Sequence, residues 1–410
     1  MLRLLAPAGA DPAARTVVAG RALRAFVDGY VAVLLPAYLL ALGLPAWAVG
    51  VLSTATLLGS ACATLAVGAW GHRFASRNLL LGAALLMAGT GIAFASVDQF
   101  WPLLIVAFVG TLNPGSGDVS VFLPLEHSRL AAATRGDART TLFARYSLLA
   151  SLSGAFGALA AGVPAWLVTQ SAGGLDELQA LRCMFVGYAL VGVVLYWLYR
   201  GLPRTAPGSS TASATATAPL RESRAIVLKL AALFCVDSFA GGLVVNSLMA
   251  LWLMQRFGLA PAATGQLFFA TGLLAAASMS AAPWVARRIG LLNTMVFTHI
   301  PANACLILAA LAPSLPLALA LLLVRSALSQ MDVPTRSAFV MSVVTPAERG
   351  AAASLTAVPR SLAAAISPGL AGALFAAGFL AAPLVASGAL KIAYDVTLWF
   401  ACRGHDLDAS

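Results

Sequence analysis

The sequence predicts an all-α membrane protein with two six-helix bundles, related by pseudo-two-fold symmetry about a central cavity. Three observations support this fold class. First, 60% of the 410 residues are apolar and only 10% are charged, whereas an ordinary soluble protein is about 25% charged. Second, apolar segments long enough to cross a bilayer core of about 30 Å recur along the whole chain. Third, several charged and glycine positions repeat between the two halves.

Twelve membrane spans are expected, with a low-complexity segment between the sixth and the seventh. The expected spans cover approximately residues 20–42, 46–69, 78–97, 101–124, 140–168, 180–200, 226–254, 262–286, 291–312, 316–341, 351–376 and 380–401. Between its terminal prolines, the segment 207–219 contains only Ser, Thr, Ala and Gly, which is typical of a flexible linker. The predicted domains are therefore an N-terminal six-helix bundle (1–203), a flexible cytoplasmic linker (204–223) and a C-terminal six-helix bundle (224–410).

The basic residues gather in alternate loops, and this pattern predicts the orientation of the chain. With the N-terminus inside, 19 of the 25 Lys and Arg residues fall in cytoplasmic segments, and only Arg182 and Arg256 face outside. The positive-inside rule then predicts that both termini are cytoplasmic. We expect a multi-pass protein of the cytoplasmic (inner) membrane of a bacterium. The net charge of +10 follows from these loops, so nucleic acid is not expected as a partner.

No motif in the sequence indicates an enzyme. The chain lacks a Walker loop and shows no Ser/His/Asp arrangement or zinc-site spacing. Its five cysteines are scattered and fit small buried apolar residues. We therefore expect no enzymatic activity, no cofactor and no bound metal.

One acidic and one basic residue recur inside the spans of both halves. Asp118 precedes Arg145 by 27 residues, and Asp332 precedes Arg360 by 28. An ionised side chain at bilayer depth costs at least a few kcal/mol, so such residues are candidates for function. A chain of repeated six-span halves around a central path is the usual plan of secondary transporters.

The loops that follow the second and the eighth span also correspond. Gly50 precedes His72 by 22 residues, and Gly265 precedes Arg287 by 22. The loop 68–77, Gly-Ala-Trp-Gly-His-Arg-Phe-Ala-Ser-Arg, is similar to the pattern G-x-x-x-D-R-x-G-R-[KR], the signature of the major facilitator superfamily. In its second-half counterpart, 283–290, the arginine and the glycine at the end of the loop match the pattern. The chain thus resembles a major facilitator superfamily (MFS) transporter of bacterial type over about residues 18–403.

The resemblance implies that these two loops gate the cytoplasmic side. The predicted gating residues are Gly68, His72, Arg73, Arg77, Arg287, Arg288 and Gly290. His72 and Arg287 stand where the family has an aspartate that is thought to latch neighbouring helices. Either the latch is built differently here, or Asp118 and Asp332 have taken over the acidic role.

The resemblance also implies that the first, fourth, seventh and tenth spans line the central cavity. One aspartate lies in each of these spans: Asp28, Asp118, Asp237 and Asp332. Helix length places Asp118 near the depth of Arg145, and Asp332 near that of Arg360, so two ion pairs are expected. These pairs either open and close during transport, with a carboxylate taking a coupling proton, or hold the helix ends together statically. Asp28 and Asp237 have no evident partner within the spans, which favours a role in a hydrated cavity.

Other residues in the spans leave alternatives open. Arg325 has no evident counter-ion, so it binds either an anionic substrate or a partner across the cavity. Lys391 and Asp395 are four residues apart, which favours a local pair on one helix face. The run Asn113-Pro114-Gly115 predicts either a local unwinding or a simple kink, and His299 is expected to be structural.

These observations predict a secondary active transporter of a small solute that works by alternating access, proton-coupled and possibly an exporter. One alternative is uptake or facilitated diffusion of an anionic metabolite held by Arg325. A second is a transporter-like receptor or scaffold that moves no solute. The expected partners are a small-molecule substrate, protons and the lipid bilayer, and the chain is expected to be a monomer.

Overall fold

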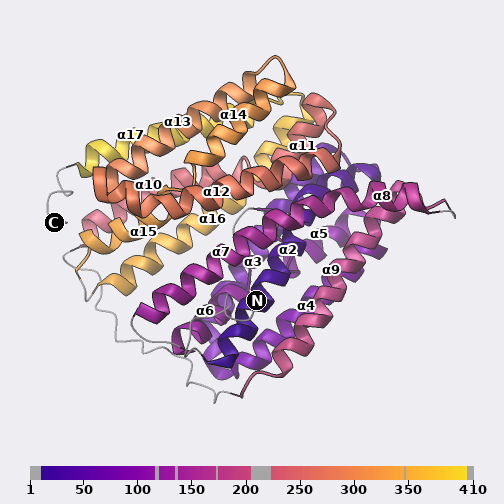
Figure 1. The fold of residues 1–410 in the computed structure, drawn as a ribbon, viewed down its shortest axis with the longest axis horizontal. Coiled ribbons are helices and arrows are strands. Elements are labelled where there is room, and N and C mark those ends of the chain that lie inside the picture. Colours follow the sequence, from indigo (N-terminus) through magenta and orange to yellow (C-terminus); the bar gives the residue numbers. More distant parts are fainter. Residues whose placement is uncertain are drawn as a thin grey trace. The chain divides into compact units, whose positions relative to one another are not determined.

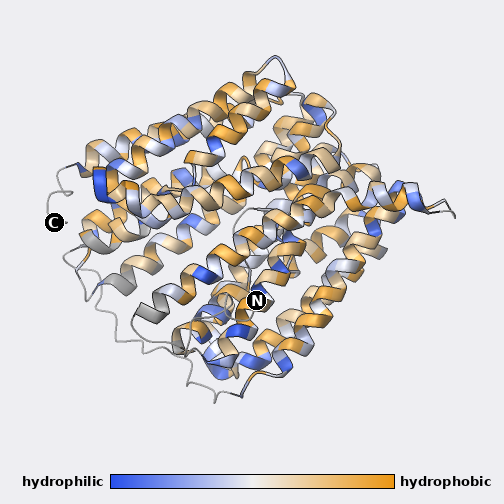
Figure 2. Cartoon of the chain, in the orientation of Figure 1, coloured by the Kyte–Doolittle hydropathy of each residue, from blue (hydrophilic) through white to orange (hydrophobic). Residues whose placement is uncertain are grey.

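The computed structural model describes residues 11–115, 120–133, 137–171, 174–204, 223–345 and 348–403. Every regular element in these residues is helical, which confirms the predicted all-α class (Figure 1). Apolar residues dominate the helices (Figure 2), and many large apolar side chains are exposed, including Trp101, Trp197 and Phe400 at 71%, 61% and 61%. Such faces suit contact with lipid rather than with water.

The helices divide into two compact units. The first comprises the described residues of Met1–Ala214 together with Asn246–Phe269, and the second comprises those of Thr215–Val245 and Ala270–Ser410. Nearly all of the predicted linker (204–223) lies outside the described residues. The predicted boundary between two six-helix bundles therefore stays a prediction.

The first unit contains the N-terminal helices. They are α2 (Pro12–Ala41), α3 (Ala46–Trp70), the 3₁₀ turn η1 (Gly71–Arg73), α4 (Ser76–Ser96), α5 (Phe100–Val109), α6 (Phe122–Ala133), α7 (Asp137–Leu159), the 3₁₀ turn η2 (Ala160–Gly162), α8 (Val163–Gln170), α9 (Glu177–Arg200), α11 (Asn246–Phe257) and the first residues of α12 (Pro261–Ile289).

The second unit contains most of the C-terminal helices. They are α10 (Arg224–Gly242), the remainder of α12, α13 (Leu291–Leu311), α14 (Leu315–Leu328), α15 (Asp332–Val343), α16 (Arg349–Ala376) and α17 (Ala382–Cys402). Within the described part of the chain, eleven helical segments are long and apolar enough to cross a membrane.

The fourth, seventh and tenth expected spans are interrupted. The fourth is not one of the eleven long segments, because α5 ends at Val109 and α6 begins only at Phe122. The seventh span is split into α10 and α11, and the tenth into α14 and α15. These are three of the four spans that the family resemblance assigns to the cavity lining. Discontinuous helices of this kind are typical of transporter binding sites.

Close packing through small residues joins α2 to α7 in the first unit. A Cβ atom at Gly157 would collide with the backbone of Phe26, and one at Gly29 would collide with the backbone carbonyl of Gly154. Only glycine permits this approach, so the small residues around Gly154 and Gly157 serve helix packing.

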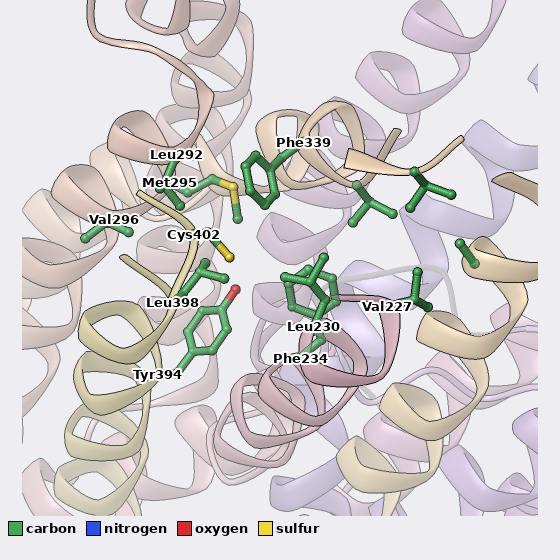
Figure 3. Close-up of a cluster of buried hydrophobic side chains, with 13 residues drawn as sticks. Val227, Leu230, Phe234, Leu292, Met295, Val296, Phe339, Tyr394, Leu398 and Cys402 are labelled. Carbon is green, nitrogen blue, oxygen red and sulfur yellow. The ribbon is translucent and has the colours of Figure 1, made fainter. Parts of the chain in front are cut away.

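An apolar cluster fills the second unit between α10, α13, α15 and α17 (Figure 3). Its largest buried members are Phe234, Met295, Phe339, Tyr394 and Leu398. This cluster forms one wall of the charged network described next.

Candidate functional site

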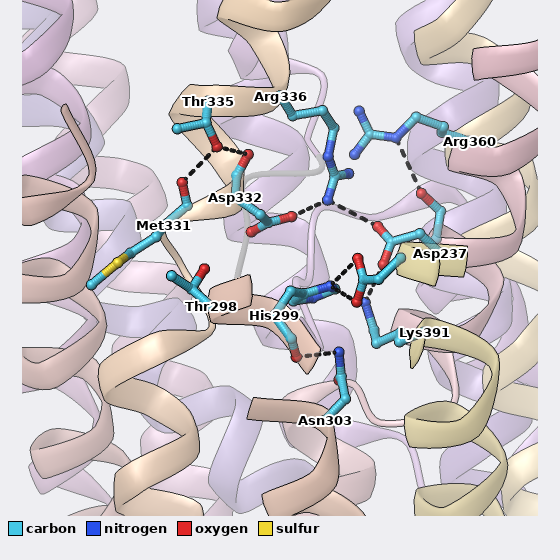
Figure 4. A network of polar contacts seen from close by, with 12 residues as sticks. Asp237, Thr298, His299, Asn303, Met331, Asp332, Thr335, Arg336, Arg360 and Lys391 are labelled. Atoms are coloured by element: carbon cyan, nitrogen blue, oxygen red, sulfur yellow. Dashed lines mark hydrogen bonds and ion pairs between the residues drawn. The ribbon is translucent and has the colours of Figure 1, made fainter. Parts of the chain in front are cut away.

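Asp237 is the centre of a buried ionic network in the second unit (Figure 4). The residue is only 4% exposed. Its Oδ1 accepts a hydrogen bond from Lys391 Nζ at 2.5 Å, and its Oδ2 lies 3.0 Å from Arg336 Nη2. Three helices, α10, α15 and α17, thus meet at one carboxylate.

The expectation that Asp237 lacks a partner within the spans is wrong. Its first cation, Lys391, is the residue that sequence spacing pairs with Asp395 along α17. Its second, Arg336, is one of the 19 basic residues that the charge count assigns to the cytoplasmic side. Arg336 is 7% exposed and belongs to α15, so it lies inside the bundle. Burial of a charge is tolerated when it is paired in this way.

Asp332 pairs with Arg336 along one face of α15, four residues away. The predicted ion pair of Asp332 with Arg360 is therefore wrong for the described residues. Sequence spacing places both residues at a similar depth, but it does not determine their rotation about the helix axes. Arg336 lies between the two carboxylates of Asp237 and Asp332 and bridges α10 to α15.

Arg360 of α16 makes a different contact. Its Nε donates a hydrogen bond to Ser238 Oγ at 3.1 Å. Its guanidinium carbon lies 5.8 Å from the centre of the Phe234 ring, and that of Arg336 lies 5.4 Å from the same ring. Both cations thus lie within the usual range for attraction to an aromatic ring.

His299 of α13 extends the network towards α17. Its Nδ1 lies 2.9 Å and 3.1 Å from the two carboxylate oxygens of Asp395. The expected local pair of Lys391 with Asp395 is not formed, because each residue instead contacts a different helix. Residues four apart share a helix face, but here each finds its partner on a neighbouring helix: Lys391 contacts α10, and Asp395 contacts α13.

A second buried ionic cluster lies in the first unit, around Glu126 of α6. Glu126 is fully buried, and its Oε2 accepts a hydrogen bond from Arg24 Nη2 at 2.6 Å. Tyr146 and Tyr199 donate to the two oxygens of the same carboxylate, each at 2.6 Å. One carboxylate thus connects α2, α6, α7 and α9.

Sequence reasoning misses this cluster. The sequence pattern places Arg24 among the basic residues at the start of the first span, and Glu126 follows the expected end of the fourth. The sequence feature that could have revealed it is Asp11-Pro12, because an aspartate followed by proline is a typical helix start. In the structure α2 does begin at Pro12 with Asp11 as its N-cap, eight residues before the expected start. Arg24 then lies one helical turn before Asp28 on α2, inside the bundle.

Asp28 lies in α2 with Arg21 as an ion-pair partner at 3.8 Å. Both side chains are largely buried, at 13% and 10% exposed. The expectation that Asp28 lacks a partner within the spans is therefore wrong, because Arg21 also belongs to the helix rather than to a preceding loop. The expected role of Asp28 in a hydrated cavity stays a prediction. Asp118 lies outside the described residues, so its predicted pair with Arg145 of α7 stays a prediction.

The interruption of the fourth span confirms the predicted local unwinding at Asn113-Pro114-Gly115. The backbone carbonyl of Pro114 accepts a hydrogen bond from the Ser247 amide at 3.1 Å. The carbonyl of Thr111 accepts one from the Tyr188 hydroxyl at 2.9 Å. Irregular backbone at membrane depth requires such replacement partners.

The predicted gating loops are located at helix ends in both units. Arg77 donates to the backbone carbonyl of Arg200 at 2.7 Å and so connects the start of α4 to the end of α9. Arg129 donates to Ser76 Oγ at 2.9 Å beside it. Burial, reinforced by the neighbouring charge of Arg77, lowers the pKa of Arg129.

The other predicted loop residues are exposed or shape the turn. Gly68, His72 and Arg73 are exposed, and so is Arg287. Arg288 lies over the Trp284 ring, 4.1 Å from its centre. Gly290 has φ +86° and ψ 162°, a backbone conformation that is essentially restricted to glycine. The signature glycine therefore permits the turn between α12 and α13.

Arg325 of α14 has no ion-pair or hydrogen-bond partner among the described residues, and its Nε atom is buried. It lies ten residues after the start of that helix, about 15 Å along a helix axis. An arginine at that depth without a described counter-ion is consistent with either of the two predicted roles.

The site as a whole is an arrangement of buried charges from several helices. Among the described residues no cluster of three or more His, Cys, Asp or Glu side chains could hold a metal ion. Lys391 and Arg336 compensate the charge of Asp237 from two other helices, so a change at one member alters the interactions of the others.

Comparison with known proteins identifies the family. The family model of the Major Facilitator Superfamily matches residues 17–368. The chain is 26% identical over 395 residues to the uncharacterized membrane protein YJR124C of Saccharomyces cerevisiae, covering 88% of this chain and 87% of that protein.

Solved transporters share the fold at low sequence identity. The nucleoside transporter NupG has a TM-score of 0.71 at 16% identity, with 95% of this chain and 98% of that chain covered. The inward-open xylose transporter XylE from E. coli has a TM-score of 0.66 at 14% identity, with 94% and 95% covered. The human organic anion transporter MFSD10 has a TM-score of 0.61 at 19% identity, with 95% and 100% covered. With the family model matched over most of its length, the chain belongs to the Major Facilitator Superfamily of membrane transporters.

Proposed function

We propose that this protein is a secondary active transporter of a small solute, that it works by alternating access, and that protons drive it. The observation that carries the proposal is the network around Asp237. Ionisable groups inside a membrane are costly and are typically retained on ion and proton pathways. Here acids and bases from α10, α13, α15 and α17 form two neighbouring buried groups, one around Asp237 and one of His299 with Asp395.

Arg336, which two carboxylates share, favours a network that rearranges during transport over one that is static. Arg336 contacts both Asp237 and Asp332, so either carboxylate remains compensated if the other takes a proton. Asp332 is the first residue of α15, after the break from α14, and Asp237 lies five residues before the end of α10. A proton bound in the network would thus change which helices are held together.

For the direction of transport we propose efflux of a small organic compound across the inner membrane, only because efflux is common in the family. The similar solved structures are those of a nucleoside transporter, a xylose transporter and an organic anion transporter. These three solute classes form the first panel of test solutes.

The experiment uses purified protein in vesicles with an internal pH dye and labelled uridine, D-xylose or a dicarboxylate. We expect a solute-dependent pH change in the wild type that is lost in Asp237→Asn. Asp98→Asn is the matched control, since the Asp98 side chain is 59% exposed and pairs with the partly exposed Arg182. Solute movement with no proton movement would contradict proton coupling, and equal activity of Asp237→Asn would contradict the role of the network.

A second candidate is uptake or facilitated diffusion of an anionic metabolite. It is supported by Arg325, whose buried Nε atom has no hydrogen-bond partner among the described residues. Arg325→Gln should then raise the apparent KM for the dicarboxylate and leave that for uridine unchanged, because only the anion would use the charge. Arg256→Gln, at an exposed arginine, is the control. An unchanged KM for the anion would reject this candidate.

A further inference from the structure

His299 and Asp395 form a buried acid–base pair on two helices, α13 and α17, that the family resemblance does not assign to the cavity lining. The residues are 5% and 1% exposed. The ring Nδ1 of His299 faces both carboxylate oxygens, at 2.9 Å and 3.1 Å. The backbone carbonyl of His299 accepts a hydrogen bond from Asn303 Nδ2 at 2.9 Å, one turn further along α13.

Asp395 differs from the other acids of the network in how its charge is compensated. Asp237 contacts Lys391 and Arg336, and Asp332 contacts Arg336, so each has a permanently charged partner. Among the described residues, the ion-pair partner of Asp395 is His299 alone. The charge balance of Asp395 therefore depends on whether the imidazole holds a proton.

Charged or titratable side chains occur on every helix packed against α13. On α17 these are Lys391 and, one residue before Asp395, Tyr394; on α15 they are Asp332 and Arg336; on α14 it is Arg325; and beyond α17, on α10, it is Asp237. Lys391 lies four residues before Asp395 and therefore on the same face of α17. Its ammonium group is 2.5 Å from Asp237 in the structure.

We propose that the pair of His299 and Asp395 is the site that binds and releases the coupling proton. The ligand is a single proton, shared between the imidazole nitrogen and the carboxylate and exchanged with water. This inference rests on the proposed proton-coupled function. Imidazole is the side chain whose charge changes between about pH 5 and pH 8, which suits exchange at physiological pH.

Lys391 connects the proton to the rest of the network. With the proton bound, Asp395 is compensated by His299, and Lys391 remains with Asp237. With the proton released, Asp395 is a buried anion without a cation, and the ammonium group of Lys391 is the nearest mobile charge on its own helix. Movement of Lys391 towards Asp395 weakens the contact between α17 and α10 and leaves Asp237 to Arg336.

The first test is a direct titration of His299 in the full-length protein in lipid nanodiscs. The chain has four histidines, so the triple variant His72→Gln/His127→Gln/His405→Gln leaves His299 as the only one. With ¹⁵N-labelled histidine, the ring signals of this variant are recorded between about pH 5 and pH 8, and a change with pH is expected of an imidazole that exchanges the coupling proton. In the same background, Asp395→Asn should alter the response of these signals to pH, because the imidazole then no longer faces a carboxylate. Ring signals that stay unchanged across this range would overturn the proposal.

The second test separates this site from the proposed function. In vesicles with an internal pH dye, each of the three panel solutes is applied to the wild type, to His299→Gln and to His127→Gln as the control. We expect His299→Gln to move solute without the accompanying pH change, and His127→Gln to keep that change. An undiminished pH change in a folded His299→Gln would overturn the assignment while proton coupling itself stands. A wild type that moves solute with no pH change would overturn proton coupling and the coupling role of this pair together.

The titration does not depend on the stability of His299→Gln, since it is read in a chain that keeps the residue. If His299→Gln fails to fold, Asp395→Asn replaces it in the flux experiment, because the amide keeps the shape of the carboxylate and loses its charge. Solute movement without a pH change is then the expected result, and an undiminished pH change would overturn the assignment.

Discussion

The ammonium group of Lys391 lies 2.5 Å from the carboxylate of Asp237 and joins two helices through residues that are 154 positions apart in the chain. Both side chains are almost fully buried, at 10% and 5% exposed. Since Arg336 contacts the other oxygen of Asp237, the carboxylate holds α10, α15 and α17 together. Loss of the Asp237 carboxylate should therefore lower both the stability of the protein and its transport activity.

Removal of one partner of this pair should destabilise the protein. We expect Lys391→Met to lower the free energy of unfolding by about 3–5 kcal/mol, because a buried carboxylate loses a cation. The double variant Lys391→Met/Asp237→Asn should recover part of this loss, because no uncompensated charge remains. Thermal unfolding in detergent measures both. The exposed pair of Asp98 and Arg182 provides the control, with an expected cost for Asp98→Asn of about 0–1 kcal/mol. Equal costs for the two pairs would contradict the burial argument.

Asp332→Asn and Arg360→Ala should have different effects on transport, since the two residues do not pair with each other. Asp332→Asn removes a carboxylate from Arg336 and should abolish solute flux while expression is kept. Arg360→Ala removes a contact with Ser238 and the cation over Phe234, and should reduce flux less severely. Flux of the labelled panel solutes in vesicles measures both. Wild-type flux in both variants would exclude a role for these residues in transport.

Glu126→Gln should destabilise the first unit more than the loss of either tyrosine hydroxyl. The amide leaves the guanidinium of Arg24, which is 2% exposed, without its ion-pair partner, at an expected cost of about 3–5 kcal/mol. Tyr146→Phe and Tyr199→Phe each remove one hydrogen bond and should cost about 1–3 kcal/mol. Thermal unfolding ranks the three variants. A Glu126→Gln variant as stable as Tyr146→Phe would show that Arg24 is satisfied by other groups.

Gly157→Ala should disturb the packing of α7 against α2. The added Cβ would collide with the backbone of Phe26, which cannot move away as a flexible side chain can. An expected cost of about 1–3 kcal/mol follows from overpacking. Gly82→Ala is the matched control, because nothing lies within 4 Å of the Cβ position at Gly82 in α4, and it should be neutral or slightly stabilising. The melting temperatures of the two variants in one detergent decide the comparison, and equal values would contradict the close approach.

The sequence alone determined the membrane class, the approximate span limits and the family resemblance. The expected span 291–312 corresponds to α13, Leu291–Leu311, and the span 180–200 corresponds to α9, Glu177–Arg200. These features are local, because the length of an apolar run and the charge of the loop after it decide where a span begins and ends. The break at Asn113-Pro114-Gly115 was predictable for the same reason, since proline and glycine act on the backbone where they stand.

Only the tertiary structure decided which charges meet. Each residue turns a helix by about 100°, so an error of one position in rotation directs a side chain to a different neighbour. Depth along the membrane placed Asp332 near Arg360, yet Arg336 on the same helix faces Asp332 and Asp237 together. In the same way, Lys391 and Asp395 share a face of α17 but contact α10 and α13 respectively. Partner choice depends on how helices distant in the chain are rotated and packed, and that information is spread over every interface of the bundle.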